Sequence, residues 1–150
     1  MKRTQIIATA GAFVAAAAAT APGVAAHGAA GPSVKLVHTT AGKLLATSKG
    51  FTLYMFTHDK SSKDTCQSIP MCTGTWPPYT VKGRPVAGPG VSASKLRTIK
   101  LANGHEQVTY YGHPLYRYAF DGGPAMTSYI GAMQFGGRWY GVSAAGKAVK

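Results

Sequence analysis

The chain contains two copies of one aromatic segment, placed 62 residues apart. Each copy follows a similar glycine-to-leucine stretch and precedes a tryptophan, Trp76 or Trp139. Repetition at such a period indicates a fold assembled from two similar units that bury a shared core. The copies are Tyr54-Met-Phe56-Thr-His-Asp59 after Gly50-Phe-Thr-Leu53, and Tyr116-Arg-Tyr118-Ala-Phe-Asp121 after Gly112-His-Pro-Leu115.

Strand signals dominate the rest of the chain. Short runs rich in β-branched and aromatic residues predict strands at 44–47, 51–56, 96–101, 107–110, 114–118 and 138–142. Asn103-Gly104 favours a tight hairpin turn between two of them. Each unit has only three or four short strands, which are marginal alone. We therefore expect an all-β fold in which two similar antiparallel units pack as one pseudo-twofold domain, a sandwich or sheet system.

Alternation within the duplicated segment assigns its side chains to two faces. Tyr54 and Phe56 share one face of their strand, while Leu53 and Met55 share the other. The second copy repeats this pattern. We expect the aromatic faces of the two copies to meet across the pseudo-twofold axis, with the two tryptophans closing the core. The aromatic residues concerned are Tyr54, Phe56, Trp76, Tyr116, Tyr118 and Trp139.

The N-terminus predicts export. Lys2 and Arg3 precede an apolar, alanine-rich run, and small residues precede a cleavage point after about Ala26. We expect a signal peptide at 1–26 and a secreted, periplasmic or extracellular protein; an uncleaved anchor is the alternative. No cysteine lies at the cleavage point, so no lipid anchor is expected, and no transmembrane span should remain after cleavage.

The expected mature chain suits one domain. We expect a flexible N-terminus at 27–33, one two-repeat β domain at 34–143, and a flexible tail at 144–150. Within the domain, repeat one is expected at about 43–81 and repeat two at about 105–142. The glycine- and proline-rich stretch 82–94 should connect the repeats across the surface.

The charge balance is strongly basic. The chain has sixteen Lys and Arg against four Asp and Glu, a formal charge of +12 at pH 7. Without Lys2 and Arg3, fourteen basic side chains remain. Such a field attracts polyanions, which outside the cytoplasm are anionic cell-wall or membrane-surface polymers rather than nucleic acid. The lysines are dispersed along the chain rather than clustered, which favours a solvated surface that confers solubility, and a polyanion-binding face is the alternative.

Cys66 and Cys72 are the two cysteines of the chain. Five residues between them can close a small loop in an oxidising compartment, so we expect a structural disulfide. A redox-active or metal-binding pair is the alternative, but the two-residue spacing typical of such pairs is missing.

Asp59 and Asp121 are the acidic residues that recur in both copies. Each follows its expected strand, where a carboxylate can accept hydrogen bonds from backbone N–H groups of a turn. Alternatively, the two carboxylates converge on one cleft as a general acid and base or as ligands of a hard cation. A carboxylate-based hydrolase is least favoured, because such a pair needs two different environments and duplicated motifs provide similar ones.

The histidines favour ordinary surface positions over a metal site. His27 and His38 lie in or near the expected loose N-terminus, and His105 lies in a hairpin turn. A weak candidate is a copper site formed by Met55, His58 and His113. We assign no metal, cofactor or catalytic residue, since nucleophile-elbow, phosphate-loop and paired-thiol zinc patterns are missing.

The duplicated motifs, the Cys66 and Cys72 pair and Trp76-Pro77-Pro78 resemble a family of bacterial secreted lipoproteins. Its members carry paired Tyr-x-(Phe/Trp/Tyr)-x-x-Asp motifs and are described as a secreted repeat of unknown function. The resemblance covers most of 43–142 and implies an exported two-repeat β domain of undetermined activity. This chain lacks the family's lipidation cysteine.

Together these features predict a secreted, non-catalytic domain associated with the cell envelope, held rigid by one disulfide, that binds anionic envelope components. The alternative is an envelope redox or metal accessory protein, in which the tyrosine and tryptophan cluster relays electrons or flanks a bound copper or haem. The chain has no Cys-x-x-Cys-His motif, so any such haem would be non-covalent.

Overall fold

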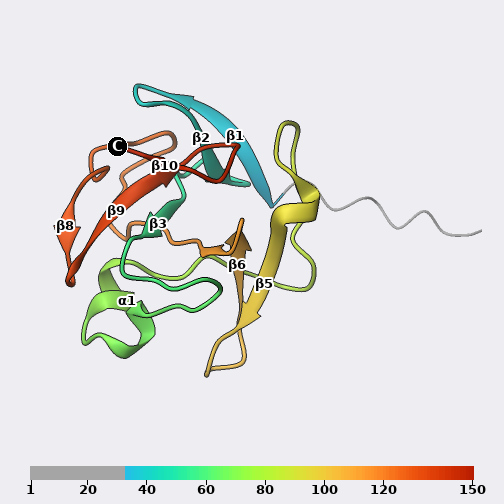
Figure 1. The fold of residues 1–150 in the computed structure, drawn as a ribbon. Coiled ribbons are helices and arrows are strands. Elements are labelled where there is room, and N and C mark those ends of the chain that lie inside the picture. The colour runs from blue at the N-terminus through green and yellow to red at the C-terminus, as the bar shows by residue number, and fades with distance from the viewer. Residues whose placement is uncertain (1–32) are drawn as a thin grey trace, which may run out of the picture.

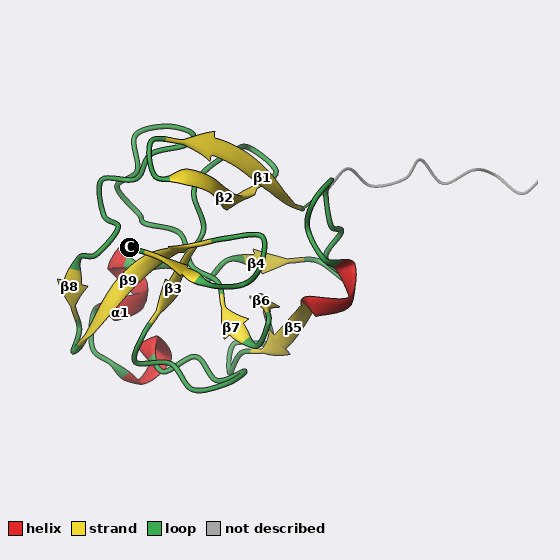
Figure 2. Ribbon diagram, turned by 45° about the horizontal axis from the view of Figure 1, so that its top comes forward, coloured by secondary structure: helices red, strands yellow, loops and turns green. Residues whose placement is uncertain are grey.

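The computed structural model describes residues 33–150, and the expected signal peptide and residues 27–32 lie outside this part. Figure 1 shows an arrangement of short strands, and Figure 2 shows the few short helical segments among them. The all-β prediction is confirmed. In chain order the strands are β1 (Val34–Thr39), β2 (Gly42–Thr47), β3 (Tyr54–Phe56), β4 (Thr80–Val81), β5 (Leu96–Lys100), β6 (Glu106–Tyr110), β7 (His113–Pro114), β8 (Met133–Gln134), β9 (Gly137–Val142) and β10 (Ala148–Val149).

The strands form three antiparallel sheets. One is the β1–β2 hairpin, the second has the order β10-β9-β3 with β8 also paired to β9, and the third has the order β4-β6-β5 with β7 also paired to β6. The helical segments are single turns: η1 (Cys66–Ser68), α1 (Cys72–Thr75) and η2 (Ala93–Lys95). Within residues 33–150, no helix has the length and apolar character needed to cross a membrane.

The pseudo-twofold axis that relates the two repeats lies between Tyr54 and Tyr116. Their backbones exchange two hydrogen bonds, each N–H donating to the other residue's carbonyl oxygen at 2.9 Å. On either side the contacts match. The Thr57 N–H donates to Arg138 O at 2.9 Å, and the Ala119 N–H donates to Thr75 O at 2.9 Å. Each duplicated strand therefore lies antiparallel to the segment that carries the other repeat's tryptophan.

Glycine permits the matching turns. Gly50 and Gly112 have φ of 89° and 80°, a left-handed conformation that a side chain disfavours. Gly50 ends the turn after β2, where its N–H donates to Thr47 O at 2.9 Å. Gly112 lies in the turn between β6 and β7. The same backbone conformation thus leads the chain into each copy of the aromatic segment.

Two clusters of buried residues fill the interior, and they lie on opposite faces of the duplicated strands. Leu53, Met55 and Leu115 belong to the aliphatic cluster. The aromatic cluster contains the complementary positions, which confirms the face assignment made from alternation. Its members are Tyr54, Phe56, Cys66, Cys72, Trp76, Tyr116, Tyr118 and Trp139.

Three expectations about the ends of the repeats are wrong. Residues 144–150 are not a plain tail, because β10 pairs with β9 in the register Ala148 to Val142 and Val149 to Gly141. The repeats do not begin near 43 and 105, because β1 pairs with β2 just as β5 pairs with β6. His38 lies within β1 rather than in a loose terminus. Tertiary pairing orders the tail although its composition has little strand signal, whereas β1 and β5 are runs that contain several β-branched residues.

Removal of residues 144–150 tests the role of β10. The Tyr110 hydroxyl, on a fully buried side chain, donates to Ala144 O at 2.7 Å and would lose that acceptor. We expect the free energy of unfolding to fall by roughly 1 to 3 kcal/mol, since a buried donor is left unsatisfied along with the lost ladder bonds. Urea unfolding monitored by tryptophan fluorescence measures the change. A chain lacking only Lys150, which lies beyond β10, is the control, and equal midpoints for all three proteins would contradict the role of β10.

Candidate functional site

The duplicated motifs meet in a column of stacked rings. Trp76 and Trp139 lie face to face, with ring centroids 4.0 Å apart and an interplanar angle of 2°. Phe56 stacks on the outer face of Trp139 at 4.1 Å and 8°. Tyr118 covers the outer face of Trp76 at 4.7 Å with a tilt of 50°. Each tryptophan is therefore enclosed between the other tryptophan and a ring from the other repeat.

The two central tyrosines contact the edges of this column. Tyr54 meets Trp76 with centroids 5.1 Å apart at 75°, and Tyr116 meets Trp139 at 5.1 Å and 87°. Edge-to-face contact places the positive rim of one ring against the negative face of another. All four side chains are fully buried. The symmetry of the sequence is thus reproduced in the geometry of its largest side chains.

Asp59 connects the two repeats through a hydrogen bond. The Tyr116 hydroxyl donates to its Oδ2 at 2.8 Å, while the Thr65 N–H and hydroxyl both donate to its Oδ1 at 2.8 Å. Burial raises the pKa of Asp59 to about 6, although these hydrogen bonds pull it downward. Asp59 thus closes the loop that runs to Thr65 and also anchors a tyrosine of the other repeat.

Asp121 occupies the equivalent position with fewer partners. The Tyr54 hydroxyl lies 3.4 Å from its Oδ2 and also 3.3 Å from Met126 O. Its Oδ1 is buried and has no hydrogen-bond partner among the described residues. Burial raises the pKa of Asp121 to about 6, partly offset by Tyr54 and by the charge of Arg117. The two recurring carboxylates therefore have related positions but different environments.

The two aspartates have different charged neighbours. Asp59 shares its surroundings with Asp64, whose charge adds to the rise of its pKa, whereas Asp121 is near Arg117. Each carboxylate is directed at a tyrosine hydroxyl of the other repeat. A structural contact between the two repeats therefore explains why the aspartate recurs in both copies of the motif.

The expected disulfide is present. Cys66 and Cys72 are bonded, and both are fully buried within the aromatic cluster. The Trp76 N–H donates to Cys72 O at 2.7 Å, so the closed loop leads directly into the tryptophan. The disulfide thus restrains the segment that positions one ring of the stacked pair.

One polar contact at the column could not be found from the repeats. The Trp76 indole N–H donates to Gln134 Oε1 at 2.7 Å, and the Trp139 indole N–H reaches Gln134 O at 3.4 Å. Gln134 thus accepts a hydrogen bond from the indole N–H of each tryptophan. The equivalent position in the first repeat, five residues before its tryptophan, is occupied by Met71. The duplication therefore does not predict a role for Gln134.

The weak copper candidates lie in different surroundings. Met55 belongs to the aliphatic cluster, on the opposite face of its strand from Phe56. His58 is exposed, with its ring 5.8 Å from that of Phe56. His113 lies in β7, and burial lowers its pKa. Across residues 33–150 no group of three His, Cys, Asp or Glu side chains is placed to hold a metal ion.

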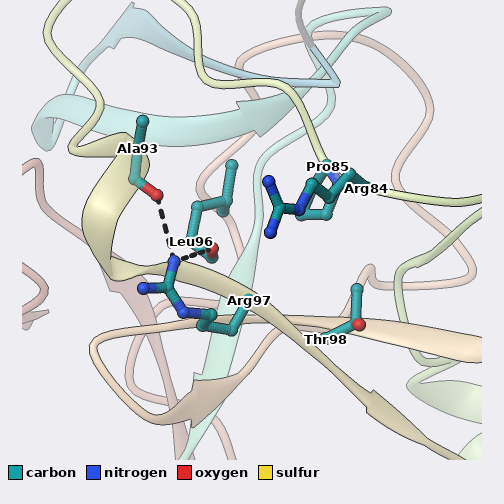
Figure 3. A pocket seen from close by; sticks show the side chains of 6 residues that line it. All are labelled: Arg84, Pro85, Ala93, Leu96, Arg97 and Thr98. Carbon is teal, nitrogen blue, oxygen red and sulfur yellow. Dashed lines mark hydrogen bonds between the residues drawn. The ribbon is translucent and has the colours of Figure 1, made fainter.

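A surface hollow of about 510 Å³ lies away from the aromatic column, where the connector approaches β5. Figure 3 shows the guanidinium groups of Arg84 and Arg97 at this hollow, on either side of Leu96 in that view. Arg97 donates from Nη1 to Leu96 O at 2.9 Å and to Ala93 O at 3.4 Å. The hollow is therefore cationic, and one of its charges is held by the backbone.

The geometry defines a duplicated β domain whose two motif copies complete each other's core. A family model described as a secreted repeat of unknown function matches residues 35–80 and 97–143, which together make up more than half of the chain. The chain belongs to this family of secreted repeats, and the resemblance drawn from the motifs is confirmed. Searches of curated proteins and of solved structures found no match.

The matched segments also correct the repeat boundaries. They begin at residues 35 and 97, which lie in β1 and β5, and so include a strand ahead of each expected start at 43 and 105. The repeat unit therefore consists of a hairpin followed by the aromatic segment and its tryptophan.

Asp121→Asn should stabilise the protein in a pH-dependent way. Folding raises the pKa of this carboxyl from 3.8 to about 6. Its contribution to the free energy of unfolding is therefore fully favourable below about pH 4, where the carboxyl is protonated in both the folded and the unfolded state, and is lost as pH rises through about 6. Asparagine is uncharged throughout. We expect the variant's advantage over wild type to grow between about pH 4 and 7, measured by urea unfolding at each pH.

Asp59→Asn is the matched contrast. Both oxygens of Asp59 accept hydrogen bonds, so an amide nitrogen there would face a donor. Because burial raises both pKa values alike, we expect Asp59→Asn to be less stable than Asp121→Asn by roughly 1 to 3 kcal/mol at each pH. An advantage of Asp121→Asn that stays constant with pH, or equal effects of the two substitutions, would contradict the assigned environments.

Proposed function

We propose that the protein is a non-catalytic, secreted domain that stays at the cell envelope by binding anionic polymers. The observation that carries this proposal is the distribution of charge. Fourteen basic side chains lie in residues 33–150, against four acidic ones. A surface with such an excess attracts anionic chains of any sequence through their charge.

Most of the carboxylates are engaged in hydrogen bonds within the protein, which increases the excess of positive charge that the surface presents. Asp59 and Asp121 face tyrosine hydroxyls of the core. Asp64 is 8% exposed, and its two oxygens accept hydrogen bonds from the backbone and side-chain N–H groups of Gln67 at 3.1 and 3.3 Å. Three of the four acidic groups thus hydrogen-bond to neutral donors, and of the two whose pKa is raised only Asp121 is near a basic side chain that shifts it, Arg117.

A rigid scaffold suits a protein that presents charge to a polymer. The disulfide, the stacked column and the exchanged Tyr54 and Tyr116 backbone bonds restrain the interior. The backbone that carries the surface cations then loses little conformational entropy on binding, and the entropic cost falls mainly on the lysine and arginine side chains.

Retention on isolated cell wall tests the proposal. We expect the purified protein to be retained at low ionic strength and released as salt is added, because the screening length falls from about 30 Å at 0.01 M to about 10 Å at 0.1 M. Changing four exposed lysines to glutamine should weaken retention several-fold, whereas changing the same four to arginine should preserve it. The positions are Lys43, Lys49, Lys82 and Lys147. No retention of the wild type at low ionic strength would contradict the proposal.

The aromatic column favours a second candidate function, an oxidisable relay. Parallel overlap of Trp76 and Trp139 lets a positive charge spread over both rings after loss of one electron, which makes the pair easier to oxidise than a lone indole. Tyr118 continues the column outward and lies 3.6 Å from Tyr129, so rings connect the buried pair to the half-buried Tyr129. The chemistry needs only an external one-electron oxidant and no bound metal.

Flash photolysis with a ruthenium(III) polypyridyl oxidant tests the relay. Tryptophan loses one electron and ruthenium(III) becomes ruthenium(II). In the wild type we expect a tryptophan radical whose spin is shared by two rings in the electron paramagnetic resonance spectrum. In Trp76→Phe the spin should be confined to one ring, with near-ultraviolet circular dichroism as the check on folding. Radicals confined to exposed tyrosines such as Tyr111 in the wild type would exclude this function.

A further inference from the structure

We propose that the hollow between the connector and β5 is a binding site for a phosphate group of an anionic envelope polymer. The inference rests on the proposed function and makes it specific, because it assigns one site and one ligand chemistry to a surface that otherwise attracts polyanions only by its overall charge.

The hollow is formed by two segments of the chain. Its volume is about 510 Å³. The connector supplies Arg84 and Pro85, while η2 and β5 supply the other side (Figure 3). The lining combines two guanidinium groups and one hydroxyl with three apolar side chains: Arg84, Arg97, Thr98, Pro85, Ala93 and Leu96.

Backbone carbonyls hold the Arg97 guanidinium in place. Nη1 donates to Leu96 O at 2.9 Å and to Ala93 O at 3.4 Å, the latter from the single turn η2. Both bonds use one nitrogen, so Nη2 and Nε keep N–H donors for a ligand. Arg84 is exposed and reaches the hollow from the connector. A partly preorganised arginine loses less side-chain freedom on binding than a free lysine does.

The surroundings carry positive charge. Lys95 is exposed next to the hollow in sequence. The acidic residue on the same hairpin, Glu106, pairs with Lys100, whereas Leu96 pairs with Tyr110 at the other end. Arg97 and Thr98, which line the hollow, are three and two residue steps from Lys100 along β5, roughly 10 and 7 Å. A phosphate at the hollow would thus meet cations nearby, with the hairpin's carboxylate at about one screening length at physiological salt.

The chemistry of the lining fits a phosphate ester. Arginine presents parallel N–H groups that match two oxygens of a phosphate, and the Thr98 hydroxyl can donate to a third. Pro85, Ala93 and Leu96 offer an apolar surface for the carbon atoms of the ester. A phosphodiester polymer supplies both parts in each repeat: its two non-bridging oxygens match the arginine N–H groups, and a bridging ester oxygen remains for the Thr98 hydroxyl. A carboxylate has only its two oxygens.

The site is not duplicated. The position equivalent to Arg97 is Lys35 in β1, and the outer edge of β1 is covered by the connector, where the Gly88 N–H donates to Val34 O at 2.8 Å. β5 instead lies at the edge of its sheet. Charged residues on an edge strand also prevent unwanted pairing, which explains an arginine on β5. It does not explain Arg84, which comes from another segment.

Binding of a synthetic glycerol-phosphate oligomer to the full mature chain tests the proposal, measured by calorimetry and by amide shifts in nuclear magnetic resonance. We expect shifts centred on Ala93, Leu96 and Thr98. The double variant Arg84→Gln/Arg97→Gln should bind about tenfold or more weakly, since charge-assisted hydrogen bonds are lost. Arg84→Lys/Arg97→Lys keeps the charge but loses the paired donors, so it should fall between this variant and wild type.

The matched control is Lys60→Gln/Lys63→Gln, which removes the same charge from exposed positions outside the hollow. It should change affinity by less than about twofold. Equal losses in the glutamine variants, or shifts spread over the whole surface, would overturn the site while leaving envelope binding by overall charge intact.

Two further probes distinguish the source of the phosphate. Inorganic phosphate should shift the same amides weakly, and vesicles containing phosphatidylglycerol should compete with the oligomer only if lipid headgroups reach the hollow. Polyglutamate of matched length should bind more weakly than the phosphate oligomer and without the Arg84 and Arg97 dependence. If polyglutamate bound as tightly as the phosphate oligomer and lost affinity equally when Arg84 and Arg97 were changed, the assignment to phosphate would be overturned.

Discussion

The structure depends on the contact between Trp76 and Trp139, because neither repeat can enclose its own tryptophan. One face of each indole is covered by the other indole, and the opposite face is covered by a ring of the other repeat, Phe56 on Trp139 and Tyr118 on Trp76. A single repeat would expose both faces of its largest apolar side chain to water. Burial of aromatic area is among the strongest favourable contributions to folding, so the duplicated chain is stable as a pair and not as two separate units.

The same contact explains the spacing within each motif. The tyrosine lies at the axis, where Tyr54 and Tyr116 exchange backbone hydrogen bonds. Two residues later, on the same face, the second aromatic ring reaches the other repeat's tryptophan, and three residues beyond that the aspartate faces the other repeat's tyrosine hydroxyl. Every position of the motif therefore contacts the other copy. The differences between Asp59 and Asp121 arise in the loops that follow, which are not alike in the two repeats.

The parts of the fold that could be predicted are those encoded by local alternation or by the repeat itself. Leu53 and Phe56 are assigned to opposite faces by the period of two, and the spacing of Cys66 and Cys72 indicated their disulfide. The parts that were missed depend on contacts between distant segments. Ala148 and Val149 form a strand because β9 offers an edge, and Gln134 is significant because both indole N–H groups point to it. Arg84 and Arg97 have no common motif, and only the path of the connector brings them to one hollow.

The placement of the carboxylates links the core to the surface. A chain with fourteen basic and four acidic side chains in its described part repels itself, and exposed carboxylates would reduce that repulsion. Instead, Asp59, Asp64 and Asp121 interact with tyrosine, threonine and glutamine donors. For two of them, Asp59 and Asp121, burial raises the pKa to about 6, which is a cost to stability at neutral pH. The stacked core and the disulfide offset both costs, and the surface is left with an uncompensated positive charge that a polyanionic partner can neutralise.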